Sequence, residues 1–201
     1  ATQDDSGTEL SAAVQGPGGI DARIAGRVAS GFASGDLTIT GTGQLNDGYG
    51  FFASDPTQGS YALVHGFDGE GPDFIRLYQD VTLPEAPSRL FFDYRAGWDL
   101  RSFNYGMTEP RIFRVKIEPA GGGTPLQFTR ILVAPMNTIV TDTGNQNGVV
   151  DLIPFAGMDV RIVFEWEVPH DYSGPAYFQL DNIDVLPANP TYLPMARKLS
   201  H

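Results

Sequence analysis

The residue types best suited to ligand chemistry fall in one short segment, 95–106, which is rich in aromatic and charged side chains. Aromatic faces stack against flat apolar surfaces such as those of sugar rings, while arginine and aspartate form directional hydrogen bonds. The segment therefore predicts a ligand-binding loop that uses Trp98, Asp99, Arg101 and Tyr105. A second interpretation stays open, in which Trp98 and Phe103 cover the core beneath a long loop.

Acidic side chains raise the question of metal binding. Asp68, Glu70 and Asp73 share the glycine-containing stretch 66–73, but their spacing is not that of an EF-hand, so a solvated turn is the plainer interpretation. The chain contains no cysteine and three histidines. Any bound metal is therefore expected to be a hard cation held by oxygen ligands.

Arrangements of residues that would support catalysis are weak in this sequence. His170 and Asp171 are neighbours without a Gly-x-Ser-x-Gly motif, and adjacent residues on a loop rarely form a working acid–base pair. Glu165 and Glu167 share one face of a predicted strand, roughly 6 to 7 Å apart, where a pair of carboxylates can hydrolyse a glycoside. A solvated outer face is the plainer interpretation of this pair, and we expect no catalytic activity.

The overall charge excludes some partners. With 13 basic and 24 acidic residues the net charge is −11, which disfavours a nucleic-acid partner because phosphate binding needs clustered Lys and Arg. No apolar run approaches the roughly 20 residues that span a bilayer. The small and polar residues from Ala1 to Ser6 resemble the end left by signal-peptidase cleavage, although a trimmed chain would look the same. We expect a secreted, extracellular protein at the cell surface.

Turn residues divide the chain beyond residue 35 into short runs, and these runs predict strands. Apolar residues alternate with polar ones most clearly around Val115 and Phe164. Strands are expected at 37–40, 50–53, 61–65, 75–83, 90–94, 112–118, 126–133, 148–152, 160–167 and 177–185. The pattern is typical of an all-β, two-sheet antiparallel sandwich with very little helix. The apolar phase of these strands predicts a core that contains Phe92, Val115, Ile162, Phe164 and Leu180.

Three regions are expected along the chain. Residues 1–30 are small and polar and predict an N-terminal arm or edge strand. Residues 31–186 form the sandwich domain, and 187–201 form a proline-containing C-terminal tail.

Two stretches resemble a known family. Residues 71–94 contain Leu-Tyr-Gln-Asp-Val-Thr-Leu-Pro followed by Leu-Phe-Phe-Asp-Tyr, and residues 150–183 contain Asp-Leu-Ile-Pro-Phe-Ala-Gly, Val-Arg-Ile-Val-Phe and Phe-Gln-Leu-Asp-Asn-Ile. In order and spacing they resemble bacterial extracellular jelly-roll domains of the MAM-like and carbohydrate-binding-module-like type. Weaker similarity at 31–37 and 58–63 extends the match to about residues 31–186. The resemblance implies a jelly-roll fold.

The same resemblance implies a structural calcium ion between the first and last strands. Carried over to this sequence, the ligands are the side chains of Asp36 and Asp181 and the carbonyl of Gly59. Ala33 stands where the family has an acidic residue, so one strong ligand is missing. The alternative is that Asp181 caps a turn.

Three functions remain open at this point. The resemblance implies a module that binds a glycan or another cell-surface ligand. The predicted arm favours a self-assembling subunit of an extracellular filament or surface layer, in which the arm of one copy adds as a strand to the exposed sheet edge of a neighbour. A hydrolase or lyase built on a jelly roll is the least favoured.

Overall fold

The computed structural model describes residues 24–25, 38–40, 51–52, 57, 62–67, 72–102, 109–170 and 174–188. Its strands are β1 (Ile24–Ala25), β2 (Thr38–Thr40), β3 (Ala62–Phe67), β4 (Asp73–Thr82), β5 (Ser88–Asp99), β6 (Arg111–Pro119), β7 (Gln127–Ala134), β8 (Ile139–Val140), β9 (Gln146–Asp151), β10 (Asp159–Val168) and β11 (Ala176–Pro187). A short 3₁₀ helix, η2 (Ile153–Phe155), is the one helical element in these ranges. None of the described residues forms a helix able to span a membrane.

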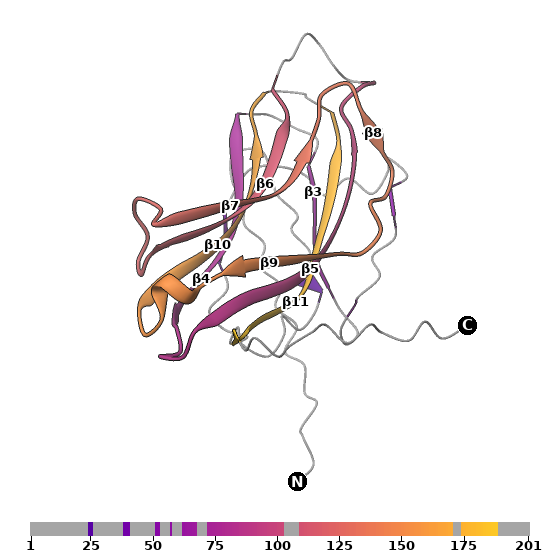
Figure 1. The fold of residues 1–201 in the computed structure, drawn as a ribbon. Coiled ribbons are helices and arrows are strands. Elements are labelled where there is room, and N and C mark those ends of the chain that lie inside the picture. The colour runs from indigo at the N-terminus through magenta and orange to yellow at the C-terminus, as the bar shows by residue number, and fades with distance from the viewer. Residues whose placement is uncertain are drawn as a thin grey trace, which may run out of the picture.

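The strands form two antiparallel sheets that pack as a sandwich, which confirms the predicted fold class (Figure 1). One sheet has the order β1-β3-β11-β5-β8, with β9 also paired to β5, and the other has the order β2-β4-β10-β6-β7. From β3 onward the chain crosses repeatedly between the sheets, so that early and late strands lie side by side. This is the strand order of a jelly roll, with β8 and β9 sharing one position along β5.

The core lies between the sheets and is made by the apolar phase of the long strands. All five residues predicted for it are buried, namely Phe92, Val115, Ile162, Phe164 and Leu180. Aromatic rings fill its centre: the ring centroid of Phe113 lies 4.3 Å from that of Phe178 on the opposite sheet. Large rings bury much apolar area per residue, so this cluster is a main source of the free energy that holds the sheets together.

One glycine is needed for this packing. Gly148 on β9 lies opposite Phe92 on β5, and a Cβ atom at position 148 would overlap the Phe92 ring. The missing side chain therefore gives the buried ring of Phe92 room to enter the core.

Two strand predictions need correction. The strand predicted at 90–94 extends to Asp99, because the buried phase of β5 continues through Ala96 and Trp98. Of the strand predicted at 50–53, Phe51 and Phe52 are described, and both lie outside any strand. Their rings instead contact the outer face of the six-stranded sheet, where Phe52 meets Tyr177 edge to face at 5.0 Å.

The predicted arm and tail lie largely outside the described residues. Within 1–30 the structure describes Ile24–Ala25, which pairs antiparallel with β3 at the edge of its sheet. Residues 189–201 are outside the described ranges.

Candidate functional site

Trp98 is a core residue. It lies on β5 opposite Ala176, is 4% exposed, and donates a hydrogen bond from Nε1 to Oγ1 of Thr138 at 2.9 Å. Trp98 therefore offers no exposed ring for stacking and belongs to the core, as in the second interpretation; Tyr105, the other ring predicted for the ligand, lies outside the described residues. The physical reason is the alternation of β5, which places position 98 on the same inward phase as Phe92 and Ala96.

The polar residues predicted beside Trp98 form a local turn. Oδ1 of Asp99 accepts hydrogen bonds from the backbone N–H groups of Arg101, at 3.1 Å, and Ser102, at 2.8 Å. Burial opposes ionisation of Asp99, but the hydrogen bonds from Ser102 and Arg101 outweigh it and lower its pKa. Arg101 is exposed, and Tyr105 lies outside the described residues. The structure thus shows Asp99 as a turn cap.

Asp181 lies at an irregularity in β11, opposite Asp93 on β5. Its Oδ2 accepts hydrogen bonds from the backbone N–H and the hydroxyl of Thr57, at 2.6 and 3.1 Å. Its Oδ1 accepts one from the backbone N–H of Asn182 at 2.7 Å, and Asn182 has a φ of 51°. These contacts fit the alternative in which Asp181 caps a turn.

Calcium binding at Asp181 stays a prediction. The other two predicted ligands, Asp36 and Gly59, lie outside the described residues. Within the described ranges no group of three or more His, Cys, Asp or Glu side chains could hold a metal ion. Because calcium needs six to eight oxygen ligands, the described residues do not by themselves form its site.

The strongest concentration of interacting polar side chains lies on the outer face of the five-stranded sheet. We call this surface the polar face. Strand alternation and register place these described side chains on it: Phe74, Arg76, Tyr78, Asp80 and Thr82 from β4; Asp159, Arg161, Val163, Glu165 and Glu167 from β10; Ile112, Arg114, Lys116 and Glu118 from β6; and Phe128, Arg130 and Val133 from β7.

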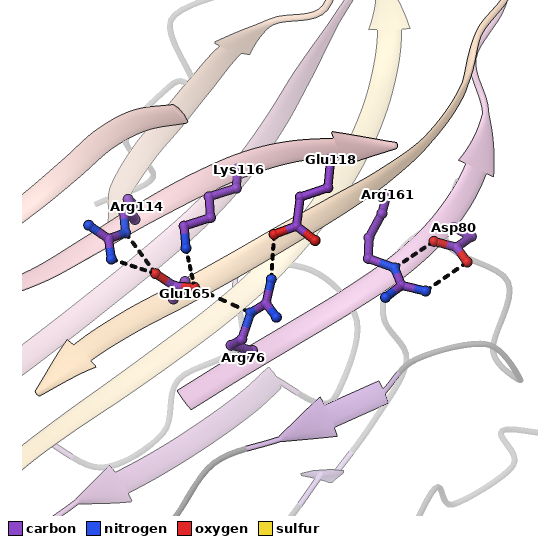
Figure 2. A network of polar contacts seen from close by, with 7 residues as sticks. All are labelled: Arg76, Asp80, Arg114, Lys116, Glu118, Arg161 and Glu165. Atoms are coloured by element: carbon purple, nitrogen blue, oxygen red, sulfur yellow. Dashed lines mark hydrogen bonds and ion pairs between the residues drawn. The ribbon is translucent and has the colours of Figure 1, made fainter. Parts of the chain in front are cut away.

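Glu165 is at the centre of the polar face (Figure 2). Its Oε1 accepts from Nε and Nη2 of Arg114, each at 2.7 Å, and its Oε2 accepts from Nζ of Lys116 at 2.5 Å. Nε of Arg76 lies 3.2 Å from the same Oε2. Three cations from two neighbouring strands therefore converge on one carboxylate that is 2% exposed.

Two further ion pairs extend the network along the strands. Nη2 of Arg76 donates to Oε1 of Glu118 at 2.5 Å. Arg161 binds Asp80 through Nε and Nη2, at 2.7 and 2.9 Å, and its guanidinium lies 4.2 Å from the ring centroid of Tyr78. The hydrogen bonds from Arg161 lower the pKa of Asp80, whose carboxylate therefore stays ionised at neutral pH.

Exposed aromatic rings flank this charged centre. Phe74 on β4 is 44% exposed and Phe128 on β7 is 66% exposed. Arg114 and Lys116 each lie 5.7 Å from the ring centroid of Phe74. The polar face thus combines apolar rings open to solvent with cationic donors whose positions are held by buried carboxylates.

The sequence interpretation of Glu165 was wrong. It placed Glu165 and Glu167 together on a solvated face, whereas Glu165 is buried beneath the side chains of its cross-strand neighbours. In the sequence, Arg114 and Lys116 alternate with the apolar residues of 112–118, which places both on the outer face of a strand. This alternation does not indicate which strands are neighbours in the sheet. The register between β6 and β10 brings these cations to Glu165.

No protein-family model and no curated protein matches this sequence. Solved structures show partial similarity. They include TmCBM61 in complex with β-1,4-galactotriose, with 15% identity, a TM-score of 0.44, and coverage of 75% of this chain and 88% of that chain. They also include a structure described as the structural basis for the promiscuous specificity of carbohydrate-binding modules from the β-sandwich superfamily. It has 12% identity and a TM-score of 0.45, and the match covers 85% of this chain and 63% of that chain.

A third similar structure is the K1 cleaved adhesin domain of Lys-gingipain from Porphyromonas gingivalis, with 13% identity, a TM-score of 0.42, and coverage of 78% of this chain and 94% of that chain. At these identities and TM-scores the similarity assigns neither a ligand nor a site to this chain.

Proposed function

We propose that this protein is a non-catalytic glycan-binding module whose ligand lies across the polar face. The observation that carries the proposal is the exposure of Phe74 and Phe128 on either side of a fixed set of Arg and Lys donors. Large aromatic side chains are usually buried because exposure to water is unfavourable. Two of them on one flat sheet face, beside oriented donors, favour a binding surface.

The chemistry of the polar face suits a sugar chain. A pyranose has apolar C–H faces that stack on aromatic rings and hydroxyl groups at its edge that accept hydrogen bonds. Phe74 on β4 and Phe128 on β7 are separated by the two strands β10 and β6, so roughly 14 Å lies between β4 and β7 at the usual strand spacing. A ligand that contacts both rings must therefore be an extended oligomer. The proposal implies action outside the cell, where polymeric glycans are displayed.

The carboxylates of the polar face are better suited to holding cations than to catalysis. Both oxygens of Glu165 accept from cationic donors, and Oε1 of Glu118 accepts from Arg76. A general acid must carry a proton to the substrate, and a general base must be free to take one. The carboxylate of Glu165 is buried beneath three cationic side chains and is not placed to touch a substrate, which supports a binding role without hydrolysis.

The test is calorimetric titration of the protein with neutral and acidic polysaccharides, comparing the wild type with Phe128→Ala. Loss of one stacking ring is expected to weaken binding about 3- to 10-fold, which corresponds to roughly 0.5–1.5 kcal/mol. Val149→Ala is the matched control, because Val149 is 48% exposed and lies on β9 of the other sheet. The affinity of this variant should equal that of the wild type. Equal weakening by both variants, or no binding to any polysaccharide, would contradict the proposal.

A further inference from the structure

Charge is distributed unequally between the outer faces of the two sheets. On the polar face there are five basic and five acidic side chains. The outer phase of β5, β9 and β11 carries two basic and five acidic side chains, which are Arg89, Arg95, Asp93, Asp99, Asp151, Asp181 and Asp184. In a chain of net charge −11, the polar face is thus neutral overall, whereas the outer face of the other sheet is acidic.

The charges of the polar face are also layered. The side chains of Glu165 and Glu118 are 2% and 4% exposed, whereas that of Arg76 is 29% exposed and those of Arg114 and Lys116 are 19% and 17% exposed. The carboxylates therefore lie beneath, and the cationic groups are nearer to solvent. A molecule that approaches this part of the sheet meets the N–H groups of the cations first.

Two arginines lie directly opposite each other at the edge of this surface. Arg114 on β6 is the register partner of Arg130 on β7. Arg114 is held by Glu165 and Glu167, whereas Arg130 is exposed and has no ion pair within the described part of the chain. Like charges directly opposite each other on neighbouring strands destabilise a sheet. The pair lies next to a shift in the β6–β7 register between Phe113 and Arg114. A local conflict beside such an irregularity is typical of a functional site.

We propose that the ligand is an acidic glycan and that its carboxylate or sulfate group binds between Arg114 and Arg130. This inference rests on the proposed function and adds the class of ligand. An anion at this position accepts charge-assisted hydrogen bonds from both guanidinium groups and relieves the repulsion between them. Phe128, two residues before Arg130 on the same face of β7, is placed to stack on the neighbouring sugar ring.

The test measures binding to four polysaccharides that differ in charge. Polygalacturonate is compared with its methyl-esterified form, and a sulfated galactan with neutral galactan. Binding of an acidic polymer at least tenfold tighter than its neutral counterpart supports the inference, and the two pairs distinguish a carboxylate from a sulfate ligand. The affinity for the acidic polymer should fall as NaCl is raised from about 50 to about 500 mM, because salt screens exposed charges.

The variant Arg130→Gln locates the site. It is expected to weaken binding of the acidic polymer about fivefold or more while the melting temperature stays unchanged or rises, because the like-charge pair is removed. A purely structural role for Arg130 would lower the melting temperature instead. Arg89→Gln is the matched control, because Arg89 is an exposed arginine of β5 on the other sheet. This substitution should leave the affinity unchanged.

The outcomes separate the two proposals. Equal binding of neutral and acidic polymers would overturn the acidic ligand and leave the glycan-binding function in place. Unchanged affinity in Arg130→Gln, or equally tight binding of a single-stranded oligonucleotide, would also overturn the acidic-glycan inference. If none of the four polysaccharides binds, both proposals fail.

Discussion

Glu165 on β10 and Arg114 on β6 lie directly opposite each other, and the guanidinium binds one carboxylate oxygen through two nitrogens, each 2.7 Å away. Lys116, which is also on β6, binds the second carboxylate oxygen of Glu165. The pairing gives the outer face of the sheet a rigid polar centre, since Arg76, Arg114 and Lys116 are each held at the end of the side chain by the buried carboxylate of Glu165.

The first prediction is that Glu165→Gln destabilises the fold. A neutral amide leaves three cations close together without their shared anion, and breaking a buried pair on one side costs about 3–5 kcal/mol. Because the cations keep some contact with water, we expect the lower end of that range. Urea denaturation should show a lower midpoint with an unchanged slope.

Glu167→Gln is the control for this substitution. Glu167 is 26% exposed and forms one ion pair with Arg114, so its loss should cost no more than about 1 kcal/mol. If both variants lose the same free energy of unfolding, the convergence of cations on Glu165 does not stabilise the sheet as argued.

The second prediction concerns Trp98. Trp98→Ala removes a buried ring and should lower the free energy of unfolding by about 3–5 kcal/mol. Trp98→Phe keeps most of the ring but loses the hydrogen bond to Thr138, and it should bind glycans as the wild type does. A stable Trp98→Ala variant that has lost glycan binding would restore Trp98 as a ligand residue.

The third prediction is a loss of stability in acid. The hydrogen bonds from Arg161 lower the pKa of Asp80, and those from Arg95 lower the pKa of Asp142. A carboxyl group with a lowered pKa in the folded state stabilises the fold above its unfolded pKa of about 3.9, and this contribution is lost as the pH falls through the folded pKa. The urea midpoint should therefore change little from pH 7 to about pH 5 and fall below about pH 4.

The double variant Asp80→Asn with Asp142→Asn tests the source of that loss. Both carboxylates are exposed, so each pair contributes at most about 1 kcal/mol at neutral pH. The variant should be slightly less stable than the wild type at pH 7 and should lose less stability on acidification. If the urea midpoint of the double variant falls between pH 5 and pH 3 by as much as that of the wild type, the acid sensitivity belongs to other groups.

The fourth prediction concerns calcium at Asp181. If the ion is bound, EDTA lowers the melting temperature of the wild type and added calcium restores it. Asp181→Asn should be less stable in any buffer because Thr57 loses a charged acceptor, and it should no longer respond to EDTA. A wild-type melting temperature that EDTA leaves unchanged would contradict calcium binding.

The sequence by itself determined the long strands and part of the core of this protein. Alternation around Val115 and Phe164 identified two central strands and their buried sides, because successive side chains of a strand point to opposite faces. The alternation of buried and outward residues in β5 continues past Tyr94 to Trp98. Applying the same rule to these residues would have placed the Trp98 ring in the core.

Only the tertiary structure decided which polar residues meet. Glu165 is separated in sequence from Arg76 by 89 residues and from Arg114 by 51, and alternation gives each residue a face but no neighbour. The crossings of the chain between the two sheets place β10 between β4 and β6, and the register then sets Arg76 and Arg114 on either side of Glu165. Strand order and register depend on packing of the whole domain, which no local pattern in the sequence encodes.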